Sequence, residues 1–201
     1  MALVSATLQA DLYSAFNAMN DIKDDSGNRY MAEKVAKAIS DFVKTGQVTS
    51  TDAGTAGDSG VYAGSGTGSI QISESNLKSK LQTTFEAKYE NNDLATHIAS
   101  DIDDVCSASN TCSTTTTGTS TIPGTSPHPA SGSGKGTFTG AKATIEAKLK
   151  SCFSSMNSMV TGGNMYFAQE FAVAVYNYLK NGTIAITLQA PMSGAGSGGI
   201  Q

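Results

Sequence analysis

The feature that most constrains the fold is a pattern of apolar residues that occurs three times along the 201-residue chain. Leu8, Leu77 and Ile145 each begin a copy, so successive copies lie 69 and 68 residues apart. In every copy a leucine follows four residues later, and a phenylalanine four residues after that. This spacing places the three side chains on one face of a helix. The predicted core positions of these helices are Leu8, Leu12, Phe16, Leu77, Leu81, Phe85, Ile145, Leu149 and Phe153.

A second apolar pattern follows the first in each copy. It begins at Met31, Leu94 and Phe167, and further apolar residues follow after intervals of four, four and three. These intervals predict a second helix with one apolar face. Alanines four residues apart, such as Ala32 and Ala36, would let a neighbouring helix approach closely. The predicted core positions of these helices are Val35, Ile39, Phe42, Ile98, Ile102, Val105, Phe171, Val175 and Tyr178.

Threonine-rich segments follow the helix pairs, at 47–51, 111–117 and 183–188. Val48 lies between Gln47 and Thr49, and Ile184 and Ile186 each neighbour a threonine. Alternation of β-branched apolar and polar residues is typical of a half-exposed strand. We therefore predict a strand after each pair of helices.

A glycine-rich segment ends each copy, as in GSGTGSI at 64–70. We interpret the glycines as a turn, where the chain reverses sharply or strands approach closely before an apolar residue enters the core. A phosphate-binding loop is excluded, because Lys135 is followed by Gly136 and not by serine or threonine. The apolar anchors are Ile70, Phe138 and Ile200, and the turn glycines are Gly66, Gly68, Gly134, Gly136, Gly196 and Gly198.

These patterns predict an α+β protein of three tandem repeat units, at 3–71, 72–139 and 140–201. A unit of this size buries little apolar surface alone, so we expect the units to pack on one another. They can close around a pseudo-threefold axis or stack linearly. Residues 113–136 are rich in threonine, serine, glycine and proline, and we expect a long surface loop there. It would be a contact arm for a neighbour or an excursion into solvent.

Composition and charge argue against two classes of partner. The net charge is −4 and the basic residues are scattered, so we expect no direct binding to nucleic acid. The chain has no 18-residue apolar stretch, so we expect no membrane insertion. The first twelve residues contain no lysine or arginine, and we expect no secretory signal there.

We predict that the protein is not an enzyme, with no catalytic, cofactor-binding or metal site. His97 and His128 have no partner at metal-ligand spacing. The acidic pair Asp103–Asp104 does not recur in all three copies, which favours a solvated helix face. The cysteines are expected to be free thiols, with a bridge between the first two as an open alternative. They are Cys106, Cys112 and Cys152.

The unit resembles small virion structural proteins of tailed bacteriophages. The resemblance lies in two short helices, a threonine-rich strand as in TGQVTST or NGTIAIT, and a GxGxI segment. Proteins of this kind typically carry one such unit, whereas this chain carries three. The resemblance implies a non-enzymatic structural component of the head, neck, tail or baseplate, located in the virion and assembled in the host cytoplasm.

Within that class, an adaptor or cement protein of the tail, baseplate or neck is the function we expect. Its partners would be other virion structural proteins, or further copies of this chain in a homo-oligomer. Two alternatives stay open. One is a capsid decoration protein, and the other is an attachment module that binds a receptor or a carbohydrate.

Overall fold

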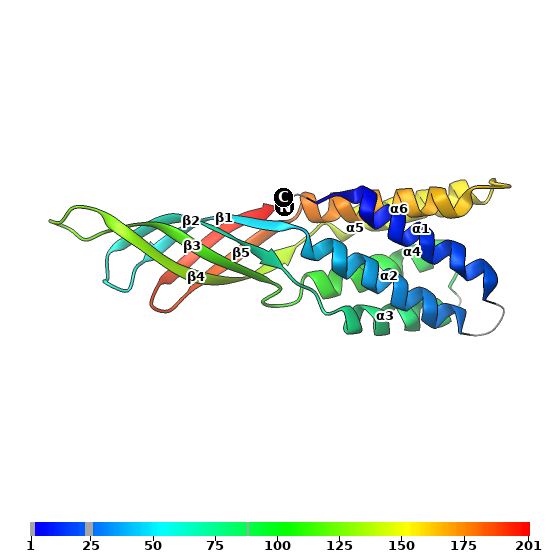
Figure 1. The fold of residues 1–201 in the computed structure, drawn as a ribbon, viewed down its shortest axis with the longest axis horizontal. Helices are drawn as coiled ribbons and strands as arrows, with labels where there is room; N and C mark the ends of the chain where they lie inside the picture. Colours follow the sequence, from blue (N-terminus) through cyan, green and yellow to red (C-terminus); the bar gives the residue numbers. More distant parts are fainter. Residues whose placement is uncertain (1–2, 23–25, 88) are drawn as a thin grey trace.

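The computed structural model describes residues 3–22, 26–87 and 89–201. Figure 1 shows an elongated molecule, with the helices gathered at one end and the strands at the other. Along the chain, a pair of helices followed by a pair of strands occurs three times, so the predicted α+β class is confirmed. The elements are α1 (Ser5–Ala18), η1 (Met19–Asp21), α2 (Gly27–Lys44), β1 (Gln47–Thr55), β2 (Val61–Ile70), α3 (Glu74–Glu86), α4 (Asn91–Cys106), β3 (Cys112–Thr121), β4 (His128–Thr139), α5 (Lys142–Met156), α6 (Gly163–Lys180), β5 (Thr183–Gln189) and β6 (Ser193–Ile200).

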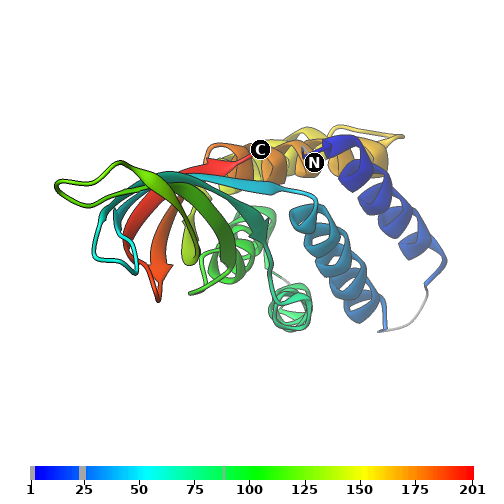
Figure 2. The ribbon, with the colours of Figure 1, turned by 60° about the vertical axis from the view of Figure 1, so that its left-hand side comes forward.

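The α-helices form a closed ring. Each packs against the next one along the chain, and α6 packs back against α1. Figure 2 shows three consecutive helices of this ring, with α1 and α2 in shades of blue and α3 in teal. The apolar face of each helix points toward the centre of the ring, because this arrangement buries all of these faces away from water. Every predicted helix core position is buried except Phe85 and Phe153, which are half-buried.

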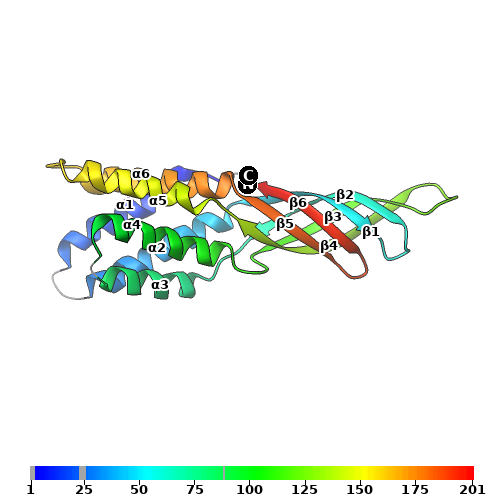
Figure 3. The same ribbon diagram turned by 180° about the vertical axis from the view of Figure 1, so that it is seen from behind.

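The strands form a closed antiparallel barrel in chain order, in which β6 pairs with β1. Val48, for example, lies opposite Gly68 of β2 on one side and Ile200 of β6 on the other. Figure 3 shows the side on which β5 and β6 complete the barrel. Closure gives every strand a neighbour on each side, which removes open edges along most of the barrel. The first part of β4, at 128–132, pairs with β3 alone.

The structure corrects the predicted glycine turn. All six of the predicted turn glycines lie inside strands, in β2, β4 and β6. The expectation of a turn is therefore wrong, and the close approach of strands is what the glycines permit. A Cβ atom at Gly68 would lie 1.8 Å from the carbonyl oxygen of Ser113, and one at Gly198 would lie 1.7 Å from that of Thr49.

The physical reason is the small bore of a six-stranded barrel. An eight-stranded barrel is just wide enough for its side chains to fill, so six strands leave less room. A Cβ atom at Gly134 would lie 2.4 Å from Ile186 Cγ2, and one at Gly196 would lie 1.9 Å from Asp52 Oδ1. Glycine-rich strands thus alternate with strands that fill the interior. Most of the interior side chains come from β1, β3 and β5 and are Val48, Ser50, Asp52, Cys112, Thr114, Thr116, Ile184, Ile186 and Leu188. Tyr62 of β2 also enters the interior, where its hydroxyl bonds that of Thr116.

The predicted long loop at 113–136 is also wrong. These residues form most of β3 and β4, which pair along their lengths, and only 122–127 connect them. Threonine is β-branched and suits a pleated strand, so a threonine-rich run is compatible with a strand as well as with a loop. Burial alternates along β3, with Thr114 and Thr116 inside the barrel. The tip of the β3–β4 hairpin extends beyond the other hairpins at this end of the molecule (Figure 1).

We expect Gly68→Ala to lower the free energy of unfolding by about 2 kcal/mol, within the range for overpacking a filled interior. The added methyl group would meet backbone and not a flexible side chain, so the strands would have to move apart. Urea unfolding measures the change. The control is Gly163→Ala at the start of α6, where the new methyl would have only an ordinary contact at 3.6 Å, to Met156. Equal stability of the two variants would contradict a tightly filled barrel.

Candidate functional site

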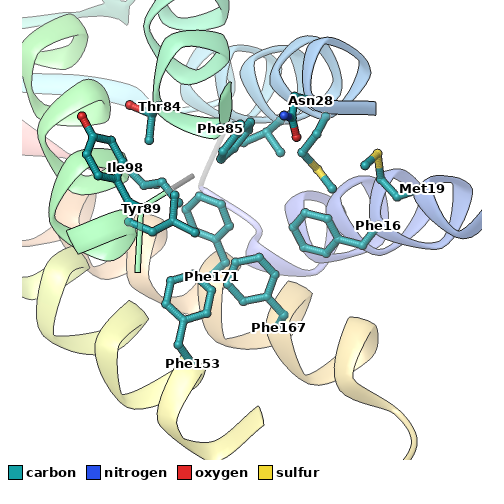
Figure 4. Close-up of a pocket in the computed structure, with 13 residues that line it drawn as sticks. Phe16, Met19, Asn28, Thr84, Phe85, Tyr89, Ile98, Phe153, Phe167 and Phe171 are labelled. Atoms are coloured by element: carbon teal, nitrogen blue, oxygen red, sulfur yellow. The ribbon is translucent and has the colours of Figure 1, made fainter. Parts of the chain in front are cut away.

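An apolar pocket of about 240 Å³ opens inside the helical ring (Figure 4). It lies toward the end of the ring remote from the barrel. The chain order fixes this placement, because the C-terminal end of α2 leads into β1 and the pocket residues Asn28 and Met31 lie at the opposite end of α2. Phe16 and Met19, near the end of α1, reach the pocket from the neighbouring helix.

The pocket lining repeats the sequence pattern. The phenylalanine that ends each first apolar pattern lines it from α1, α3 and α5. The first two apolar positions of each second pattern line it from α2, α4 and α6. All the α-helices therefore contribute. In order of the helix pairs, the lining residues are Phe16, Met31 and Val35; Phe85, Leu94 and Ile98; and Phe153, Phe167 and Phe171.

One side of the pocket is aromatic. The Phe167 ring lies 4.8 Å from that of Phe16, 5.2 Å from that of Phe153 and 5.6 Å from that of Phe171, centroid to centroid. Contacts of this length are favourable beyond the area that they bury. The helix pair α5 and α6 thus presents three rings where the other two pairs present one ring and two aliphatic side chains each. The pocket suits an apolar group that can lie against these rings.

Two of the side chains at the pocket that carry polar groups, Thr84 and Tyr89, contact protein partners. The Thr84 hydroxyl donates a hydrogen bond of 2.7 Å to Asp101 Oδ2, and burial raises the pKa of Asp101. Tyr89, at the edge of the pocket, stacks on His97 with 4.0 Å between ring centroids. His97 therefore packs against an aromatic ring on the surface of α4. The lining therefore suits non-covalent binding of an apolar group.

Exposed apolar side chains lie around the same end of the ring. They belong to the connections between paired helices and to the first turn of α6. Val160 is 97% exposed, the largest exposed fraction among these side chains. A shallow hollow of about 450 Å³ between α1 and the α5–α6 connection adjoins it. We call this surface the end face, and its exposed apolar residues are Tyr89, Met159, Val160 and Met165.

The acidic side chains of α4 have structural partners. Asp103 accepts a hydrogen bond of 2.6 Å from the Tyr178 hydroxyl of α6, and Asp104 forms an ion pair of 2.9 Å with Lys80 of α3. The pair Asp103–Asp104 thus joins α4 to its neighbours. It does not form a two-carboxylate site.

At the opposite end of the molecule, Asp58 joins the β1–β2 connection to the β3–β4 hairpin. Its carboxylate accepts hydrogen bonds of 2.9 Å from the Gly60 amide and from the Ser120 hydroxyl, and it pairs with His128 Nε2. The Gly60 amide and then His128 lower the pKa of Asp58. Ser120 donates to the aspartate and not to the histidine, so the three residues do not form a nucleophile with its base.

Cysteine and metal chemistry are not supported in the described residues. Cys106, Cys112 and Cys152 are free and buried. Burial raises the pKa of Cys106 to about 12 and those of Cys112 and Cys152 to about 11, so the reactive thiolate is scarce near neutral pH. Within 3–22, 26–87 and 89–201, no three histidine, cysteine, aspartate or glutamate side chains come together as metal ligands would.

Comparisons with known proteins give no match to a protein-family model, a curated protein or a solved structure. None of the helices in the described residues is both long enough and apolar enough to span a membrane. The pocket and the end face are the exposed apolar features at this end of the helical ring.

Sequence patterns identified some of these residues and missed others. The three pattern phenylalanines were expected in the core, and the structure brings Phe16, Phe85 and Phe153 together at the pocket. The contact between Asp58 and His128 had no local signal, because 70 residues separate them. The sequence around Val160 contains no pattern that indicates an exposed side chain.

We expect the Asp58 carboxyl to titrate below its ordinary pKa of 3.8. Because its folded-state pKa is lowered, its contribution to stability is present above pH 3.8 and is lost as the pH falls through the lowered value. Carbon-detected NMR titration of the carboxyl group measures this pKa. His128→Gln should raise it in part, since the Gly60 amide stays in place. A titration midpoint at or above 3.8 in the unaltered protein would contradict the contact.

Proposed function

We propose that the chain is built of three tandem repeats, at 3–71, 72–139 and 140–201, around a pseudo-threefold axis. The order of elements supports this, since two helices and two strands occur three times. Corresponding positions also have corresponding environments. Val48, Cys112 and Ile184 are all buried at the starts of β1, β3 and β5.

We further propose that the protein is a non-enzymatic structural component of a bacteriophage virion, and that it works as an adaptor or cement protein in the tail, baseplate or neck. The observation that carries this proposal is the closure of one chain into a helical ring and a barrel in series. A monomer with internal threefold character fits a threefold axis of an assembly without the need for three separate chains.

The end face is the surface that we propose to meet a neighbouring virion protein. Burying Val160 and the three other apolar side chains of the end face would remove them from water, which favours association. An apolar side chain of the neighbour would enter the pocket at the same end. The filled barrel would then serve as a rigid extension and not as a channel.

Particle composition tests this proposal. The protein should occur in purified particles at a fixed number of copies, measured by quantitative mass spectrometry, and imaging of the particle should place it at the tail, baseplate or neck. Placement on the capsid surface would indicate the decoration alternative. Absence from particles, with binding of the isolated protein to cells or glycans, would indicate an attachment module.

We expect Val160→Asp to reduce incorporation into particles at least about tenfold, because a charge replaces an apolar contact in a partner-covered surface. The matched control is Val61→Asp on β2, where an exposed valine receives the same substitution far from the end face. Thermal unfolding of both variants checks that the fold is kept. Equal incorporation of the two variants would contradict docking through the end face.

A further inference from the structure

The barrel interior contains one carboxylate without a protein partner. Asp52 of β1 is 1% exposed, and neither of its oxygens has a hydrogen-bond partner in the described part of the chain. Its neighbours on the interior surface are glycine, hydroxyl-bearing and aliphatic residues, and no lysine, arginine or histidine is buried there among the described residues. Burying an unpaired charge costs several kcal/mol, so a folded protein must compensate it.

Two hydroxyl groups without partners lie near this carboxylate. Ser50 of β1 is 6% exposed and Thr114 of β3 is 4% exposed, and the side-chain oxygen of each has no partner in the described residues. Gly66 of β2 lies beside all three side chains, and the Thr114 hydroxyl lies toward Gly134 of β4, where a Cβ atom would be 2.8 Å from Thr114 Oγ1. A Cβ atom at Gly66 would lie 2.5 Å from Ser50 Oγ, 2.8 Å from Asp52 Oδ2 and 3.3 Å from Thr114 Cβ.

A neighbouring pair of hydroxyl groups in the barrel has its own hydrogen bond and is therefore not part of this set. The hydroxyls of Tyr62 and Thr116 lie 2.6 Å apart and hydrogen-bond each other. On β5 the corresponding interior residues are Ile186 and Leu188, which offer no ligand atom. The set without partners is thus one carboxylate and two hydroxyls, on adjacent sides of Gly66.

We propose that Asp52, Ser50 and Thr114 bind one small monovalent cation, sodium or potassium, inside the barrel. Carboxylate and hydroxyl oxygens are hard ligands, which suit hard cations. A single positive charge balances the single carboxylate, whereas a divalent ion would leave one charge uncompensated. A buried water molecule would satisfy the hydroxyls but would leave the carboxylate charge in place.

The binding site is enclosed on both sides along the barrel. Val48, Cys112 and Ile184 fill the barrel toward the helices, and Leu188 and Met192 are buried toward the tip. An ion held here is bound by the folded chain and not by the unfolded chain. Binding of this kind raises the stability of the folded state as the ion concentration rises.

Thermal unfolding near pH 7.5 tests the proposal, in sodium chloride, potassium chloride and N-methyl-D-glucamine chloride at equal ionic strength. The melting temperature should be higher in sodium or potassium, and it should rise by about 3–5 °C per tenfold increase in the bound ion. The salt that gives the larger rise identifies the ion. Equal melting temperatures in all three salts would overturn the proposal.

Two variants sharpen this test. Asp52→Asn should abolish the difference between the salts, and in N-methyl-D-glucamine it should melt above the unaltered protein because no buried charge remains. Asp11→Asn, at an exposed position of α1, should keep the salt dependence. If Asp52→Asn does not fold, crystals of the unaltered protein grown with thallium(I) decide the question. An anomalous peak among Asp52, Ser50 and Thr114 supports the site, and its absence refutes it.

Discussion

The narrow bore of the six-stranded barrel is the constraint on which the rest of the structure depends. Six strands have little room for interior side chains from every strand, so every second strand presents mainly glycine to the interior, with Tyr62 of β2 as an exception. Each glycine-rich strand must lie between strands that carry the filling residues. A hairpin of one filling strand and one glycine-rich strand meets this need, and the chain order of paired strands provides it.

The helical ring follows from the same arrangement. Each helix pair directly precedes a strand hairpin in the sequence, and short connections such as Thr45–Gly46 join α2 to β1. The helices are therefore distributed around the barrel end, where their apolar stripes meet on the inside. Phe42, Val105 and Tyr178, with the aliphatic residues beside them, fill the ring near the barrel. Farther away, the larger spread of Phe16, Phe85 and Phe153 leaves the pocket.

The sequence alone was enough to predict the helices and their buried faces, since a spacing of four residues reports directly on one face of a helix. It was misleading for the glycines, because glycine is rare in strands and its local preference is for turns. Its role at Gly68 depends on how close another strand comes, which only barrel closure determines. Asp52 was overlooked for the same reason, since no local pattern distinguishes an aspartate inside a barrel from one on its surface. The spatial pairing of Asp58 with His128 likewise arises only when the hairpins meet.

The pairing of β6 with β1 makes the last junction of the barrel equivalent to the others. Leu3 and Ile200 both approach Gly46, and the two ends of the chain lie side by side in Figure 1. Each hairpin of the closed barrel has a hairpin neighbour on both sides. The contacts therefore do not require any particular hairpin to come first in the sequence. A circularly permuted chain that starts at residue 72, with the present ends joined by a short linker, would retain all the strand pairings and helix contacts.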